Sequence, residues 1–167
     1  MIEAALIASK TSPGFLRKKW GFFHLPNFEK DHWLQWKKEK DNLRIPLVRG
    51  KIFGSDKSRE TADTCKKHIL KAGFGTSIEV NYDEIAYFRP KAAPDFILTN
   101  PPYGKRLEAS LELFEEIKKF IKEKAAPEAK AYVLCPEVNF VESAGCLAKE
   151  ELSFKNGGLP VKLLAIL

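Results

Sequence analysis

A short motif follows an apolar run in the middle of the sequence. The motif is Asn100, Pro101, Pro102 and Tyr103, and the apolar run is Phe96–Leu98. The apolar run predicts a strand buried on both faces of a parallel sheet, and such sheets bind ligands at the carboxyl ends of their strands. Two prolines stiffen the turn and remove two backbone donors, which leaves carbonyl oxygens as acceptors. The Asn100 side-chain oxygen is a further acceptor, and Tyr103 offers a flat ring. These residues predict a receptor for an amino group on a planar base; the alternative is a Pro-Pro turn that only ends the strand.

The elements that must position this motif alternate along the chain. Helical spacing of apolar residues and stop signals at Thr11–Gly14 and Gly73 set most of the expected boundaries. Helices are expected over 2–9, 29–43, 58–71 and 107–121, and strands over 51–54 with its end at Asp56, 77–80, 96–98 and 132–135. Residues 15–28 are expected to form an aromatic and basic loop. The alternation from 51 to 148 predicts an α/β fold with a mostly parallel sheet and helices on both sides.

The end of the chain differs in kind. Asn156-Gly157-Gly158 lies between two segments, Glu151–Phe154 and Val161–Ile166. Asn-Gly is a strong hairpin signal because both residues tolerate a positive φ. The sheet is therefore expected to finish with an antiparallel pair.

Composition excludes several classes. The chain has 167 residues, of which 44% are hydrophobic and 30% charged, and this is typical of one globular domain. We expect neither a membrane span nor a signal segment, since no apolar run is long enough and Glu3 interrupts the N-terminal one. The cysteines Cys65, Cys135 and Cys146 are odd in number and set in apolar surroundings, which favours a reducing, cytoplasmic location. Cys65 and His68 lie one helical turn apart, but no second pair has ligand spacing, so no metal site is expected.

The positive charge is concentrated near the start. Residues 1–50 hold ten Lys/Arg and five Asp/Glu, and so carry +5 of the net charge of +6. Basic residues alternate there with aromatic ones, a mixture suited to phosphates through charge and to bases through stacking. The alternative is a solvated basic face with its aromatic rings turned into the core.

The Asn100–Tyr103 motif resembles the catalytic motif of S-adenosylmethionine-dependent amino methyltransferases. The resemblance implies that the Asn100 side chain and the Pro101 carbonyl bind the acceptor amine, that Pro102 shapes the turn, and that Tyr103 stacks on the base. Methyltransferases acting on DNA adenine or on a protein glutamine share these four residues and remain alternatives.

Five segments, in the same order, resemble the bacterial THUMP-associated methylases that make N2-methylguanine in large-subunit 23S ribosomal RNA, a family with a methylase domain of the UPF0020 type. This resemblance covers nearly the whole chain. It implies a Rossmann-like class I methyltransferase fold, S-adenosyl-L-methionine as cofactor and ribosomal RNA as partner. The five segments are Ile2–Ala5, Pro13–Phe15 with Trp20–Phe22, Gly54–Asp56, Asn100–Leu107 and Lys155–Gly157.

The resemblance also assigns individual residues. Asp56 matches the acid that binds the cofactor's ribose hydroxyls, and Asp83 matches the acid that receives the adenine amino group, with Asn100 close to the cofactor. An N-terminal helix cap is the alternative for Asp56. For RNA phosphates the expected contacts are Arg17, Lys18, Lys19, Lys105 and Arg106.

The sequence departs from the family at its front. Family members carry a glycine-rich cofactor loop immediately before the segment that matches Ile2–Ala5, and here Met1 stands at that point. We expect residues 1–167 to be a single, N-terminally truncated methyltransferase domain, without its first strand and with a basic aromatic insertion at about 11–49. Activity of this chain alone is expected to be impaired, and an upstream THUMP-containing segment or chain is a candidate partner. The alternative is an inactive remnant or RNA-binding module.

Overall fold

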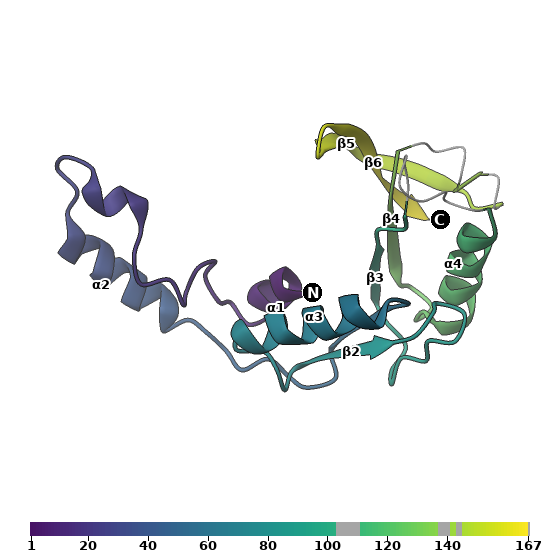
Figure 1. Ribbon diagram of the computed structural model, residues 1–167, viewed down its shortest axis with the longest axis horizontal. Helices are drawn as coiled ribbons and strands as arrows, with labels where there is room; N and C mark the ends of the chain where they lie inside the picture. The colour runs from purple at the N-terminus through teal and green to yellow at the C-terminus, as the bar shows by residue number, and fades with distance from the viewer. Residues whose placement is uncertain (103–110, 137–140, 143–144, 167) are drawn as a thin grey trace. The chain divides into compact units, whose positions relative to one another are not determined.

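The computed structural model describes residues 1–102, 111–136, 141–142 and 145–166 (Figure 1). The chain divides into two compact units, Met1–Asp83 and Glu84–Leu167. The helices of the described residues are α1 (Ile2–Ala8), the 3₁₀ helix η1 (Gly21–His24), α2 (Lys30–Asp41), α3 (Arg59–Lys71) and α4 (Leu111–Lys124). The strands are β1 (Ile52–Asp56), β2 (Ile78–Tyr82), β3 (Phe96–Thr99), β4 (Lys130–Cys135), β5 (Ala148–Asn156) and β6 (Leu159–Ile166).

In the first unit, α3 connects two parallel strands, β1 and β2, in a β–α–β arrangement. Ser58 caps α3, because its side chain accepts a hydrogen bond from the Thr61 N–H (3.2 Å), and this satisfies one of the helix's unpaired donors. Ile69 of α3 is buried against apolar residues from α1 and from the start of β2. The core of this unit comprises Ala5, Leu6, Ile69, Phe74 and Ile78.

Residues 11–49 extend from this core, and both ends of the segment lie beside it. The Ile45 N–H donates to the Ser9 carbonyl oxygen (2.9 Å), so the two ends of the segment meet. Between them lie η1 and α2, neither of which has a buried residue. The expected helix at 29–43 is confirmed as α2. The expected loop at 15–28 contains the single 3₁₀ turn of η1.

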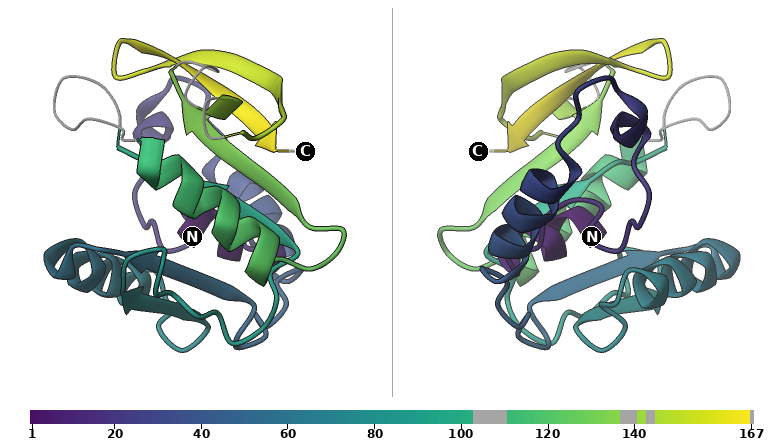
Figure 2. Two further views of the ribbon diagram at one scale, coloured as in Figure 1. Left: turned by 90° about the vertical axis from the view of Figure 1, so that its right-hand side faces the viewer. Right: turned by 90° about the vertical axis from the view of Figure 1, so that its left-hand side faces the viewer.

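In the second unit, four strands form one sheet in the order β3-β4-β6-β5. β3 and β4 are parallel, whereas β6 runs antiparallel to both β4 and β5. Figure 2 shows α4 lying along this sheet. Phe114 and Ile117 of α4 pack against Val133, Cys135 and Leu164, which explains why the helix repeats its apolar residues at helical spacing.

The C-terminal hairpin is confirmed, with Gly157 and Gly158 between β5 and β6 at φ values of 58° and 86°. The strands of the described residues fall into two sheets, one in each unit. Both sheets contain a parallel pair joined through a helix, and the antiparallel pair comes last, which confirms the expected α/β class.

The expectation that β3 is buried on both faces is wrong. Phe96 and Leu98 are 60% and 62% exposed. Of the described strands, only β4 pairs with β3, which is an edge strand. Ile97 and Thr99 lie opposite Ala131 and Val133, on the face that α4 covers, while Phe96 and Leu98 belong to the other face. Apolar composition alone did not reveal that Phe96 and Leu98 lie on the face of β3 opposite α4.

Candidate functional site

Two acidic residues lie at the same edge of the first unit's sheet. Asp56 ends β1 and pairs with Tyr82, the last residue of β2, and Asp83 follows Tyr82 directly. The Ser55 hydroxyl donates to the Asp83 carbonyl oxygen, which ties the two strand ends together. Because β1 and β2 are parallel, both acids lie at the carboxyl ends of their strands, the edge at which such sheets bind ligands.

The Asp56 carboxylate is oriented by the backbone. Its Oδ1 atom accepts a hydrogen bond from the Ser58 N–H (2.8 Å), and the residue is half-buried. The alternative for Asp56 was that it caps the N-terminus of the following helix, but the residue that caps α3 is Ser58. A half-buried carboxylate held at a strand end has the chemistry to accept hydrogen bonds from a ribose diol. Asp83 is also half-buried, and its carboxylate is of the type that accepts from an amino group.

The motif after β3 lies in the second unit. Asn100 comes directly after Thr99, the last residue of β3, and its side chain is exposed. Pro101 is buried and Pro102 half-buried, so the turn after the strand is anchored by its first proline. Since β3 and β4 are parallel, Asn100 lies at the carboxyl edge of this pair too. Tyr103, Lys105 and Arg106 lie outside the described residues.

The three basic residues expected to contact RNA lie together before η1. Arg17, Lys18 and Lys19 are exposed. The Arg17 guanidinium lies 5.1 Å from the centre of the Trp20 ring, and its Nε donates to the Lys19 carbonyl oxygen (3.0 Å). In the described part of the chain, neither Lys18 nor Lys19 has an acidic side chain within ion-pair distance, so their charge faces solvent.

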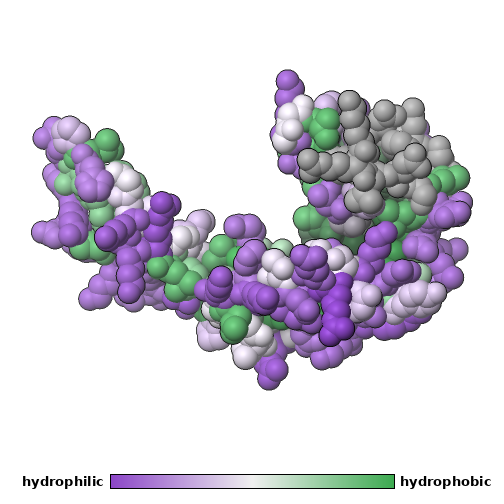
Figure 3. All heavy atoms as spheres, in the orientation of Figure 1, coloured by the Kyte–Doolittle hydropathy of each residue, from purple (hydrophilic) through white to green (hydrophobic). Residues whose placement is uncertain are grey.

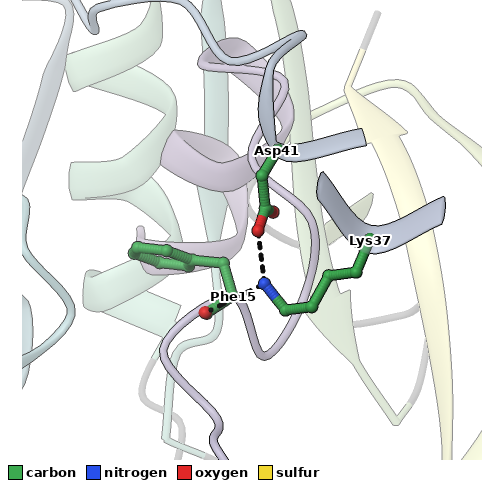
Figure 4. A network of polar contacts seen from close by, with 3 residues as sticks. All are labelled: Phe15, Lys37 and Asp41. Atoms are coloured by element: carbon green, nitrogen blue, oxygen red, sulfur yellow. Dashed lines mark hydrogen bonds and ion pairs between the residues drawn. The ribbon is translucent and has the colours of Figure 1, made fainter. Parts of the chain in front are cut away.

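A polar network that sequence reasoning missed holds α2 to the preceding loop (Figure 4). The Lys37 ammonium forms an ion pair with Asp41 and donates to the Phe15 carbonyl oxygen (3.4 Å). Both side chains are largely buried, with 19% and 29% exposed for Lys37 and Asp41. The i, i+4 spacing of a basic and an acidic residue was the signal that could have found the pair.

The clear pKa shifts of the described residues lie elsewhere. Burial raises the pKa of the Cys146 thiol, and hydrogen bonds from Lys162 and Ser153 lower the pKa of the Glu150 carboxyl. Cys146 packs in the core beside α4, and Glu150 lies on β5. Among the described residues no group of three or more His, Cys, Asp or Glu side chains could hold a metal ion. No described helix is long and apolar enough to cross a membrane.

Parallel strands joined through helices, polar residues at their carboxyl ends and a closing antiparallel hairpin are typical of Rossmann-like α/β folds. Comparison with known proteins narrows this class. The family described as "UPF0020: RMKL-like, methyltransferase domain" matches residues 1–161. This chain belongs to that family.

A curated relative is named ribosomal RNA large subunit methyltransferase K/L, from Shewanella oneidensis; it is 30% identical over 95% of this chain. The chain spans 23% of that relative's length. The chain thus corresponds to about a quarter of the length of the curated relatives that it matches.

Solved structures share the fold. A structure described as a methyltransferase complexed with SAH is 22% identical, with a TM-score of 0.85 over 98% of this chain and 44% of that one. Another, titled a predicted N6-adenine-specific DNA methylase from Listeria monocytogenes, is 27% identical. Its TM-score is 0.75, over 97% of this chain and 42% of that chain. The predicted fold class is confirmed.

Proposed function

We propose that this chain is the part of an S-adenosylmethionine-dependent RNA methyltransferase that holds the cofactor's adenosine and the acceptor amine. The reaction transfers a methyl group to the exocyclic N2 amine of a guanine in large-subunit ribosomal RNA. The observation that carries the proposal is the place of Asn100-Pro101-Pro102, directly after a parallel strand and anchored by a buried proline.

When bound, S-adenosylmethionine supplies an electrophilic methyl group on a sulfonium centre. Asp56 accepts hydrogen bonds from the ribose hydroxyls, and Asp83 accepts one from the adenine amino group. The Ser58 N–H holds one Asp56 oxygen in place, so the carboxylate is oriented before the ligand arrives. Such preorganisation reduces the cost of ordering side chains on binding.

The acceptor amine is held by two oxygens of this chain. The Asn100 side-chain oxygen and the Pro101 carbonyl accept its two N–H groups, which directs the nitrogen lone pair toward the methyl group. This lone pair is otherwise delocalised into the base, so orientation and electrostatics supply most of the rate enhancement. Tyr103 stacks on the base, which must first leave its stacked position in the RNA.

The ribosomal RNA assignment is favoured over DNA by the name of the curated relative. The similar Listeria structure, titled an N6-adenine-specific DNA methylase, keeps DNA adenine as a second candidate. A non-catalytic RNA-binding module is the third. The methylated nucleoside separates these candidates.

Cofactor binding is tested by saturation-transfer NMR, which detects weak complexes, with S-adenosylhomocysteine added to the 167-residue chain. We expect adenine and ribose protons to receive saturation from the chain. Asp56→Asn should weaken this transfer at the ribose protons and Asp83→Asn at the adenine protons.

The matched control is Asp63→Asn, an exposed acid on α3 away from the strand ends. Circular dichroism checks that each variant is folded. Equal saturation in the Asp56, Asp83 and Asp63 variants, or none in the wild type, would contradict the assigned cofactor contacts.

A further inference from the structure

An open groove of about 360 Å³ lies at the start of α2. Asn27, Phe28, Glu29, His32, Trp33 and Trp36 line it, and we call it the α2 groove. All six residues belong to the first unit. None is among the residues assigned to methyl transfer, so this is a separate feature of the surface.

The apolar wall of the α2 groove is supported from behind. The Trp33 ring lies 5.5 Å from the Trp20 ring and 5.4 Å from the Phe23 ring, centre to centre. The Phe28 ring lies 5.2 Å from the Phe22 ring. These contacts fix Trp33 and Phe28 in place, as edge-to-face and offset ring pairs do.

Trp36 is more exposed than Trp33. It is 49% exposed, and no other ring of the described residues stacks on it. The Lys40 ammonium lies 5.8 Å from the centre of the Trp36 ring. A large exposed indole beside a cation is the combination with which proteins bind unpaired bases, through stacking and charge together.

The charge around the groove favours a polyanion. Residues 11–49 hold nine Lys/Arg against four Asp/Glu. Within the described residues, one of these acids, Asp41, is already paired with Lys37. Lys38 and Lys40 are exposed on α2. Figure 3 shows apolar residues interspersed among hydrophilic ones over this region.

We infer that the α2 groove binds an unpaired base of single-stranded RNA. The base stacks on Trp36 against Phe28, the Asn27 and Glu29 side chains offer hydrogen bonds to its edge, and Lys40, which lies beside Trp36, holds a neighbouring phosphate. This inference rests on the proposed function, since RNA is the substrate there. It adds a substrate-positioning site outside the methyl-transfer motif.

The experiment measures fluorescence anisotropy of a labelled single-stranded oligoribonucleotide titrated with the 167-residue chain, without cofactor. Removing one stacking partner costs about 1–3 kcal/mol per base, so Trp36→Ala should weaken binding about 5-fold to 150-fold. The matched control is Leu34→Ala, an equally exposed apolar residue of α2 (44%) outside the groove. It should leave affinity within about twofold, since exposed substitutions away from a site have small effects.

Two further measurements separate stacking from charge. Lys40→Gln should lower the salt dependence of binding, because a lost phosphate contact removes roughly 0.7 from the slope for single strands. A duplex of the same sequence should bind more weakly than the single strand, since its bases are not available to stack.

Several results would overturn the inference. Equal affinities of Trp36→Ala and Leu34→Ala, tighter binding of the duplex, or self-association through the groove without RNA binding would each do so. Because no cofactor is present, these failures are distinct from a failure of the proposed methyl transfer, which Asn100→Ala reports.

Discussion

Two regions of the first unit, one built around a core and one built around rings, differ in how they are held. In the first, α1, α3, β1 and β2 surround buried residues such as Ala5 and Ile69. In the second, residues 11–49, every residue is described, and only Thr11 is buried. That segment is held by ring contacts, the Lys37 network and the backbone bond between Ile45 and Ser9.

The difference assigns separate tasks to the two regions. A strand end on a packed core holds a carboxylate in a fixed geometry, as Ser58 does with Asp56. A segment with exposed rings and cations offers a surface that adapts to a flexible polyanion. If the proposed function holds, chemistry at the strand ends and RNA contact on the segment should respond to mutation independently.

The largest expected effect sharpens this separation. Asn100→Ala should lower the rate of methyl transfer about 10²–10³-fold, as the loss of one charge-stabilising group typically does. Its RNA affinity should stay unchanged, because the residue acts on the reacting amine. Single-turnover rates and anisotropy measure the two quantities. A parallel loss of rate and affinity would instead give Asn100 a structural role.

Ile69→Ala tests the packed region. Ile69 is 2% exposed between α1 and β2, and such a truncation costs about 2–5 kcal/mol of unfolding free energy. The neighbouring Leu70→Ala is the control, since Leu70 is 71% exposed and should change stability by no more than about 0.5 kcal/mol. Urea unfolding followed by circular dichroism gives both values. Similar losses of stability in the two variants would contradict the account that a packed core holds this region.

Lys37→Met tests how the segment is held. The substitution leaves the largely buried Asp41 carboxylate without its cation, so we expect a loss of about 1–2 kcal/mol. Lys38→Met, one residue further along α2 and exposed, is the control and should have little effect on stability. Tryptophan fluorescence during urea unfolding reports on this segment, which holds Trp20, Trp33 and Trp36. An unchanged midpoint for Lys37→Met would show that the Lys37 network does not hold α2.

The smallest effect lies in the second unit, on its exposed hairpin. Lys162 and Ser153 hold the pKa of Glu150 below its ordinary value of 4.5. A carboxyl whose pKa is lower in the folded chain than in the unfolded chain stabilises the fold at any pH above its unfolded pKa. That contribution disappears as the pH falls through its folded pKa. Because the pair is exposed, its effect on stability is small. Lys162→Met should raise the Glu150 pKa in an NMR titration, more than Ser153→Ala does.

Much of this fold follows from local sequence signals. The stop at Gly73 and the hairpin after Asn156 are short-range features, and the structure has both, with the positive φ values at Gly157 and Gly158 rather than at Asn156. The exposure of Phe96 and Leu98 could not be predicted, because it depends on which elements cover a sheet face. The Lys37 network also needed the fold, since Phe15 lies 22 residues away in sequence.

The sequence also predicted where in the fold the candidate site residues lie. Position after a strand places Asp56, Asp83 and Asn100 at carboxyl edges, as expected from the sequence. The α2 groove was not predicted, because the spacing of Trp33 and Trp36 shows that they share a helix but not which of them is covered.

The most direct test of the central claim is the identity of the methylated nucleoside. The 167-residue chain, in excess over large-subunit ribosomal RNA, is incubated with S-adenosylmethionine labelled in its methyl group, and the RNA is digested to nucleosides. Label in N2-methylguanosine, weak because activity of this chain alone is expected to be impaired and absent from the Asn100→Ala reaction, is the predicted result. Label in N6-methyladenosine, or no label above the Asn100→Ala background, would contradict the account.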